Sequence, residues 1–144
     1  MKRLSVLVSS VKWRRVVAGG ALWALVYNLV WGVAWFAFMR EEWLDAVAAI
    51  GHPLPLTAEV WFLWAAMTLP IGVAIMGHAA SHERPSWKTS IHAAVAVWLL
   101  MTLGMVGWGV QESIPIRAIA LDSTVNIVSM VAASLAGGWS LRAD

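Results

Sequence analysis

Four long apolar segments, separated by short polar stretches, dominate the sequence. They cover residues 17–39, 60–79, 91–110 and 114–135. A helix needs about 20 mostly apolar residues to cross the roughly 30 Å hydrocarbon core of a bilayer, and each segment has that length. The pattern predicts an all-α integral membrane protein with four transmembrane helices, in a single domain over residues 1–144.

The polar connections predict how these spans are arranged. Residues 82–88 and 111–113 are too short for a crossover, so the spans on either side should be antiparallel neighbours in an up-down four-helix bundle. Between the first two spans, Trp43, Val47 and Ile50 share one helical face, and Gly51 ends the run. We therefore expect a short interfacial helix at 42–50 on the outer side. Small residues spaced by four predict close helix contacts at three places: Gly20 and Ala24, Gly104 and Trp108, Ala133 and Gly137.

Composition supports the membrane assignment and excludes several chemistries. The 144 residues are 60% hydrophobic with a mean hydropathy of +0.73, outside the range of soluble domains. The 11 tryptophans favour the headgroup level of a bilayer. Without cysteine there is no disulfide, thiolate metal site or cysteine nucleophile.

The charged residues predict the orientation of the bundle. Only Arg40 and Arg117 flank the outer ends of the spans, whereas the remaining basic residues flank the ends nearest the termini: Lys2, Arg3, Lys12, Arg14, Arg15, Arg84, Lys88 and Arg142. The positive-inside rule then places both termini in the cytoplasm, in the inner membrane, with the first span retained as a signal-anchor. A net charge of +2 explained by topology does not suggest a nucleic-acid partner.

The last span carries three polar residues where a lipid-facing helix should have none. Asp122, Asn126 and Ser129 are spaced by four and three residues, which places them on one face of the helix. A charged side chain at the helix centre costs about 2.5 to 3.5 kcal/mol, so Asp122 must be paired, protonated or in contact with water. Arg117 is about 140° around the helix, so a threonine hydroxyl or an asparagine amide is the expected partner.

Polar residues on the other spans lie at matching depths. Trp31, Thr68 and Thr102 are level with Asp122, about 12 Å from the outer ends of the helices. Tyr27, Asn28 and Trp98 are level with Asn126. We predict one mid-membrane polar layer, and the alternatives for its members are hydrogen bonding between helices and ligand binding. The predicted binding residues are Asp122, Asn126, Asn28, Tyr27, Thr68, Thr102, Trp31 and Trp98.

Three histidines form a second candidate site near the cytoplasmic side. His78 and His82 are four residues apart at the end of the second span, and His92 returns at similar depth in the third. We expect no cofactor in this protein. The alternative is zinc on the three histidines, or haem between His78 and His92.

Three classes of function fit these residues. The first is binding or translocation of a small solute or proton at Asp122, in a protein that lies in the lipid bilayer and works as a homo-oligomer. The second is an accessory or assembly subunit whose polar face meets a membrane-protein partner. The third is a membrane enzyme acting on a lipid or isoprenoid with Asp122 as general acid or base, which we rank last.

Overall fold

The computed structural model describes residues 12–51 and 56–141, and in these residues the chain is helical with no strand. Its elements are α2 (Trp13–Ala34), the π-helical segment η1 (Trp35–Met39), α3 (Arg40–Ala49), α4 (Ala58–Ala80), α5 (Trp87–Glu112) and α6 (Ile116–Trp139). Most of the basic N-terminal stretch, the loop around His52 and Arg142 lie outside the described residues.

Within the described residues, four helices are long and apolar enough to cross a membrane, which indicates a multi-pass membrane protein. The first runs unbroken over Trp13–Ala49, and the others are α4, α5 and α6. The first helix, α4 and α5 extend beyond the expected spans at both ends, and Thr57 and Ser86 cap the starts of α4 and α5. α6 begins two residues after the expected start and ends four residues after the expected end.

The helix expected at 42–50 is present but is not separate from the first span. α3 begins at Arg40 and follows η1 directly, so the chain passes from α2 to α3 without a turn. Trp43 and Val47 share a face as expected, and they are buried in a cluster that includes Ala118 of α6. The apolar face of α3 therefore packs on protein, and a position at the membrane interface stays a prediction.

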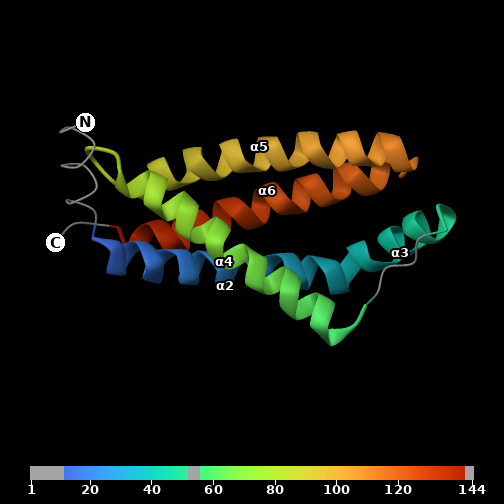
Figure 1. The fold of residues 1–144 in the computed structure, drawn as a ribbon, viewed down its shortest axis with the longest axis horizontal. Helices are drawn as coiled ribbons and strands as arrows, with labels where there is room; N and C mark the ends of the chain where they lie inside the picture. Colours follow the sequence, from blue (N-terminus) through green and yellow to red (C-terminus); the bar gives the residue numbers. More distant parts are fainter. Residues whose placement is uncertain (1–11, 52–55, 142–144) are drawn as a thin grey trace.

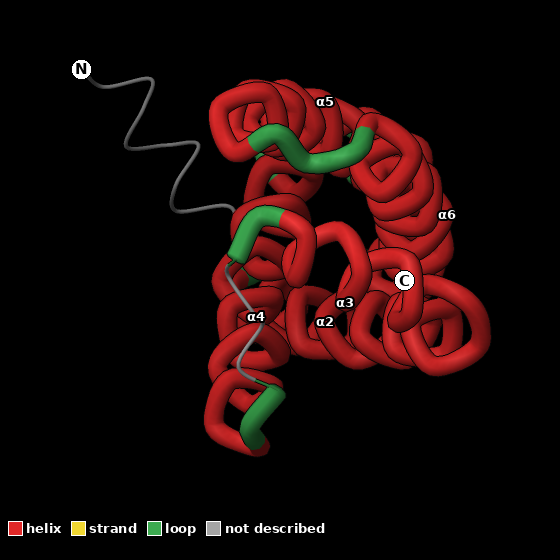
Figure 2. Tube along the Cα trace, turned by 90° about the vertical axis from the view of Figure 1, so that its right-hand side faces the viewer, coloured by secondary structure: helices red, strands yellow, loops and turns green. Residues whose placement is uncertain are grey.

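The helices pack in the order α4, α2, α6, α5. α2 lies against both α4 and α6, and α5 lies against α6. α4 crosses α2 obliquely and diverges from α5 beyond their connecting turn (Figure 1), and the end-on view shows α4 on one side of α2 and α6 on the other, with α5 next to α6 (Figure 2). We call the end with Trp13 and Trp139 the terminal end and the end with α3 the distal end.

Glycines set the close contacts of α2. A Cβ atom at Gly72 of α4 would lie 2.5 Å from the Gly20 carbonyl oxygen, and one at Gly137 of α6 would lie 2.7 Å from the Gly19 carbonyl oxygen. Such spacing lets helix backbones approach closely in a membrane. The close contact predicted at Gly104 is wrong, because nothing lies within 4 Å of a Cβ atom there.

Two buried apolar clusters divide the interior along its length. The terminal cluster is built around Val16, Trp23, Tyr27, Ile75, Met76, Met130 and Ala133. The distal cluster is built around Trp35, Met39, Trp43, Val47, Ile114, Ala118, Ile119 and Val125. Asp122 lies on α6 between Ile119 and Val125 of the distal cluster, and Met130 of the terminal cluster follows about two turns later.

Candidate membrane-embedded binding site

Asp122 is the acidic residue buried in the middle of α6, with 6% of its surface exposed. The Asn126 side-chain amide donates to Asp122 Oδ2 at 2.6 Å and to the Asp122 backbone oxygen at 3.0 Å. The two residues face each other because they are one turn apart. The Trp31 side chain of α2 also interacts with the Asp122 carboxyl group. The partner of Asp122 is thus an asparagine amide, one of the two expected.

Tyr27 of α2 fixes how Asn126 is oriented. Its hydroxyl donates to Asn126 Oδ1, so the amide nitrogen of Asn126 is the group that faces Asp122. Tyr27 is held by stacking on Trp23, with ring centroids 5.2 Å apart and planes 8° apart. Trp23 Nε1 in turn donates to Ser134 Oγ at 3.0 Å. This chain of contacts ties α2 to α6 and presents an ordered amide and carboxyl pair.

Ser123 joins the site to α5. Its backbone oxygen accepts from Trp98 Nε1 at 2.8 Å, and its hydroxyl pairs with Thr102 Oγ1 at 2.8 Å. The sequence reasoning identified Trp98 and Thr102 but missed Ser123, since attention to the face of Asp122 and Asn126 excluded a residue about 100° around the helix. The available signal was that Asp122 and Ser123 are adjacent, so α6 has polar side chains on two faces.

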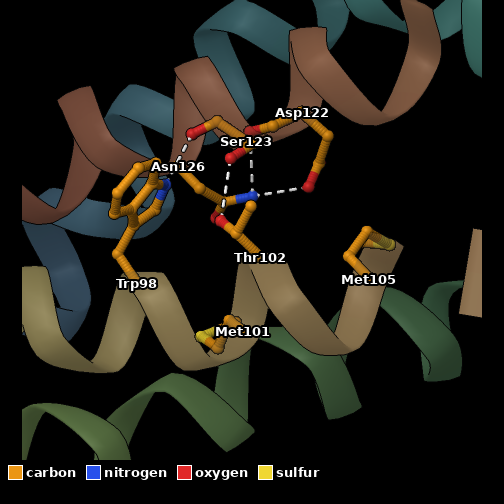
Figure 3. Close-up of a pocket in the computed structure, with 7 residues that line it drawn as sticks. All are labelled: Trp98, Met101, Thr102, Met105, Asp122, Ser123 and Asn126. Carbon is orange, nitrogen blue, oxygen red and sulfur yellow. Dashed lines mark hydrogen bonds between the residues drawn. The ribbon is translucent and has the colours of Figure 1, made fainter. Parts of the chain in front are cut away.

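A small cavity of about 40 Å³ lies between α5 and α6 beside this polar group. Figure 3 shows Trp98 and Thr102 pointing from α5 toward α6, with Met101 apart from the hydrogen-bonded residues. A cavity of this size has room for water, and its polar groups come from Asp122, Asn126, Thr102 and Ser123. The lining residues are Trp98, Met101, Thr102, Met105, Asp122, Ser123 and Asn126.

Asn28 and Thr68 belong to a different contact. Asn28 Nδ2 donates to Thr68 Oγ1 at 2.7 Å and to the Ala24 oxygen at 2.8 Å, and the Thr68 hydroxyl donates to the Ala65 oxygen at 2.6 Å. This pair joins α2 to α4 and has no hydrogen bond to Asp122 or Asn126. The residues predicted to share one layer therefore form two separate contacts, because Tyr27 and Asn28 are consecutive and point toward different neighbours. That they form one binding site stays a prediction.

The charged and hydroxyl residues expected near Asp122 bond to other groups. Arg117 pairs with Glu42 of α3, with Nε and Oε2 3.4 Å apart, at the distal end. Ser129, predicted on the face of Asp122, is buried but donates to its own helix at the Val125 oxygen, 2.8 Å away. In residues 12–51 and 56–141, Asp122 forms no salt bridge with lysine, arginine or histidine.

The structure does not bring the three histidines together. His78 and His82 have ring centroids 5.0 Å apart, and Nδ1 of His82 is 3.0 Å from the His78 backbone oxygen. All three histidines, including His92, are exposed. Within the described part of the chain no group of three potential ligands is able to hold a metal ion, so the zinc prediction is wrong, and haem between His78 and His92 stays a prediction.

Comparison of the chain with protein-family models, with curated proteins and with solved structures gives no match. The argument for function therefore rests on the geometry around Asp122.

Proposed function

We propose that the protein binds or translocates a small solute or proton at Asp122. The observation that carries the proposal is a buried carboxyl group that borders a cavity and has no cationic partner in the described residues. An ionisable side chain in a membrane span is costly and marks a functional site by default. The cavity of about 40 Å³ restricts what enters to a water-sized species or the head group of a larger molecule.

Hydrogen bonding prepares the site for such a ligand. The Tyr27 hydroxyl and Asn126 amide supply donors on one side of Asp122, and the Thr102 and Ser123 hydroxyls lie on the α5 side. Asp122 accepts from neutral groups, so the site supplies negative charge that a proton or cation would balance.

The test is a flux measurement on liposomes that contain the full chain and an internal pH-sensitive dye. We expect ammonium or a proton gradient to change the internal pH faster than in empty liposomes. Asp122→Asn should abolish the faster change of internal pH, because an amide side chain neither carries a negative charge nor binds and releases a proton near neutral pH. The matched control is Asp45→Asn, the same chemical change at an exposed position of α3.

Either of two results contradicts the proposal. One is equal flux for the wild type and Asp122→Asn. The other result combines two observations on the wild type: its flux equals that of empty liposomes, and its tryptophan fluorescence shows no saturable change with any cation tested. Gel filtration of each variant separates loss of the site from loss of the fold.

The second candidate is an accessory subunit of a membrane complex, and the exposure of α4 favours it. In its distal half Phe62 is 76% exposed and Met67 is 57% exposed, although Thr68 is buried. A partner helix would cover this surface. Purification from native membranes should then recover a stoichiometric membrane protein, and Phe62→Ala with Met67→Ala should release it.

For the topology, we propose an up-down antiparallel arrangement in the cytoplasmic membrane with both termini in the cytoplasm and α3 on the outer side. The support is the charge distribution: Arg14, Arg15, Arg84 and Lys88 lie near the terminal end, whereas Arg40 and Arg117 lie near the distal end. Labelling of cysteines introduced at Ser81 and Ser113 from opposite sides of intact cells tests this orientation.

A further inference from the structure

Buried apolar side chains of α6 flank the Asp122 cavity on both sides along the bundle axis. On the distal side, Ala118 and Ile119 of α6 are buried in the distal cluster together with Trp35 and other residues of the first helix. On the terminal side, Met130 is buried in the terminal cluster. Packed apolar side chains leave no polar path for a hydrated ion, whose desolvation is costly. A ligand that entered along the axis would have to cross one of these clusters.

The cavity is exposed on its lateral side instead. Met101 is the lining residue classed as exposed, with 44% of its surface accessible, whereas Asp122 is buried and the other lining residues are partly buried. Met101 lies midway along α5, which is one of the helices able to span the membrane. At that depth the surrounding medium is lipid. The edge of the cavity therefore faces the hydrocarbon core of the bilayer.

Indole rings connect the carboxyl group to the lipid-exposed surface. Trp31 interacts with Asp122 and packs against Trp64 of α4, with ring centroids 6.2 Å apart. Trp64 is 41% exposed. Trp98 lines the cavity on the α5 side. Aromatic faces attract ammonium groups, and this attraction is strongest where water is excluded.

From these observations we infer that the ligand is a lipophilic organic cation, such as a long-chain ammonium compound, which reaches Asp122 sideways from the bilayer past Met101. Its charged head occupies the cavity against the Asp122 carboxylate and the Trp98 indole ring, and its apolar chain stays in lipid. This inference rests on the proposed function at Asp122 and names its ligand class. The small volume, the negative charge and the lateral exposure all point to the same class.

The experiment measures tryptophan fluorescence of the full chain in phosphatidylcholine nanodiscs. Three probes separate charge from solubility: decylammonium, which is lipophilic and cationic; methylammonium, which has the same head but stays in water; and 1-decanol, which is lipophilic and neutral. We expect saturable binding of decylammonium. The other two should bind about tenfold more weakly or not at all, because each lacks one required property.

Two pairs of variants test the site and the route. Asp122→Asn should weaken decylammonium binding about tenfold or more, and Asp45→Asn should not change it. Met101→Trp should narrow the lateral edge and weaken or slow binding. Leu100→Trp is its matched control, since Leu100 is 71% exposed and does not line the cavity.

Failure of this inference is distinguishable from failure of the proposed function. If methylammonium binds as well as decylammonium and Asp122→Asn removes both, the site binds cations from water and only the lipophilic class is wrong. If Met101→Trp and Leu100→Trp both bind decylammonium with the affinity and rate of the wild type, the lateral route is wrong. If Asp122→Asn binds every probe as the wild type does, both proposals are wrong.

Discussion

Two polar contacts at similar depth differ in what they leave unsatisfied. The contact between Asn28 and Thr68 joins α2 to α4, and both side chains also bond to backbone oxygens of their own helices. The contact between Asn126 and Asp122 borders a cavity and includes a carboxyl group with no cationic partner in the described residues. The first is complete as a hydrogen-bonded pair, which is common between membrane helices. The second is the contact at which we propose that a ligand binds.

Depth alone therefore does not identify a functional residue in a membrane bundle. Asn28 and Tyr27 are neighbours on α2, yet one stabilises a helix contact and the other orients the amide beside Asp122. A carboxyl group that has no cationic partner and borders a cavity is a more selective criterion than depth. The predictions below separate the two contacts by changing one while keeping the other.

The largest expected effect comes from Gly72→Val. A side chain there meets the Gly20 backbone oxygen, which cannot move without shifting α2, so we expect the free energy of unfolding to fall by up to about 3 kcal/mol. Because α4 carries Thr68 but none of the cavity residues, decylammonium binding by the folded fraction should persist. Unfolding titrations measure the first effect and fluorescence titrations the second. Gly104→Val is the control, because a Cβ atom there meets no other atom within 4 Å. If Gly72→Val loses as much decylammonium binding as Asp122→Asn does, the contact of α2 with α4 and the contact at Asp122 are not independent.

A smaller effect is expected for Tyr27→Phe, which keeps the stacked ring and removes the hydroxyl. Asn126 Oδ1 loses its donor, which should lower the free energy of unfolding by about 1 to 2 kcal/mol. The Asn126 amide is then free to rotate away from Asp122, so ligand affinity should fall as well. Both quantities are measured in detergent and nanodiscs. Unchanged affinity would mean that Asn126 keeps its orientation without Tyr27.

The smallest effect is expected for the contact between α2 and α4. In a double-mutant cycle of Asn28→Leu and Thr68→Val, the coupling free energy should be about 0.6 kcal/mol, typical of hydrogen bonds between membrane helices. Ligand affinity should not change in any of the three variants. A change as large as that of Tyr27→Phe would place Asn28 and Thr68 in the binding site after all.

Sequence reasoning predicted the long apolar helices and the shared face of Asp122 and Asn126, because both depend on local patterns. Long apolar runs specify membrane helices, and the spacing of Asp122 and Asn126 places them on one face whatever the rest of the fold does. It failed where neighbours had to be chosen. It grouped Asn28 with Asp122 by depth, missed Ser123, and kept zinc as an alternative for histidines that the helices leave exposed.

The apolar pattern of the sequence thus predicted, for residues 12–51 and 56–141, a helical fold with four helices long enough to cross a membrane. It also predicted that Asp122 faces protein, since hydrophobic length and helical period are properties of one segment at a time. Only the tertiary structure decided which helices touch. The glycines of α2 bring α4 and α6 close on two sides, while α5 contacts mainly α6. The orientation of each helix about its own axis determines which side chains meet. In α2 this orientation places Tyr27 against Asn126 and Asn28 against Thr68.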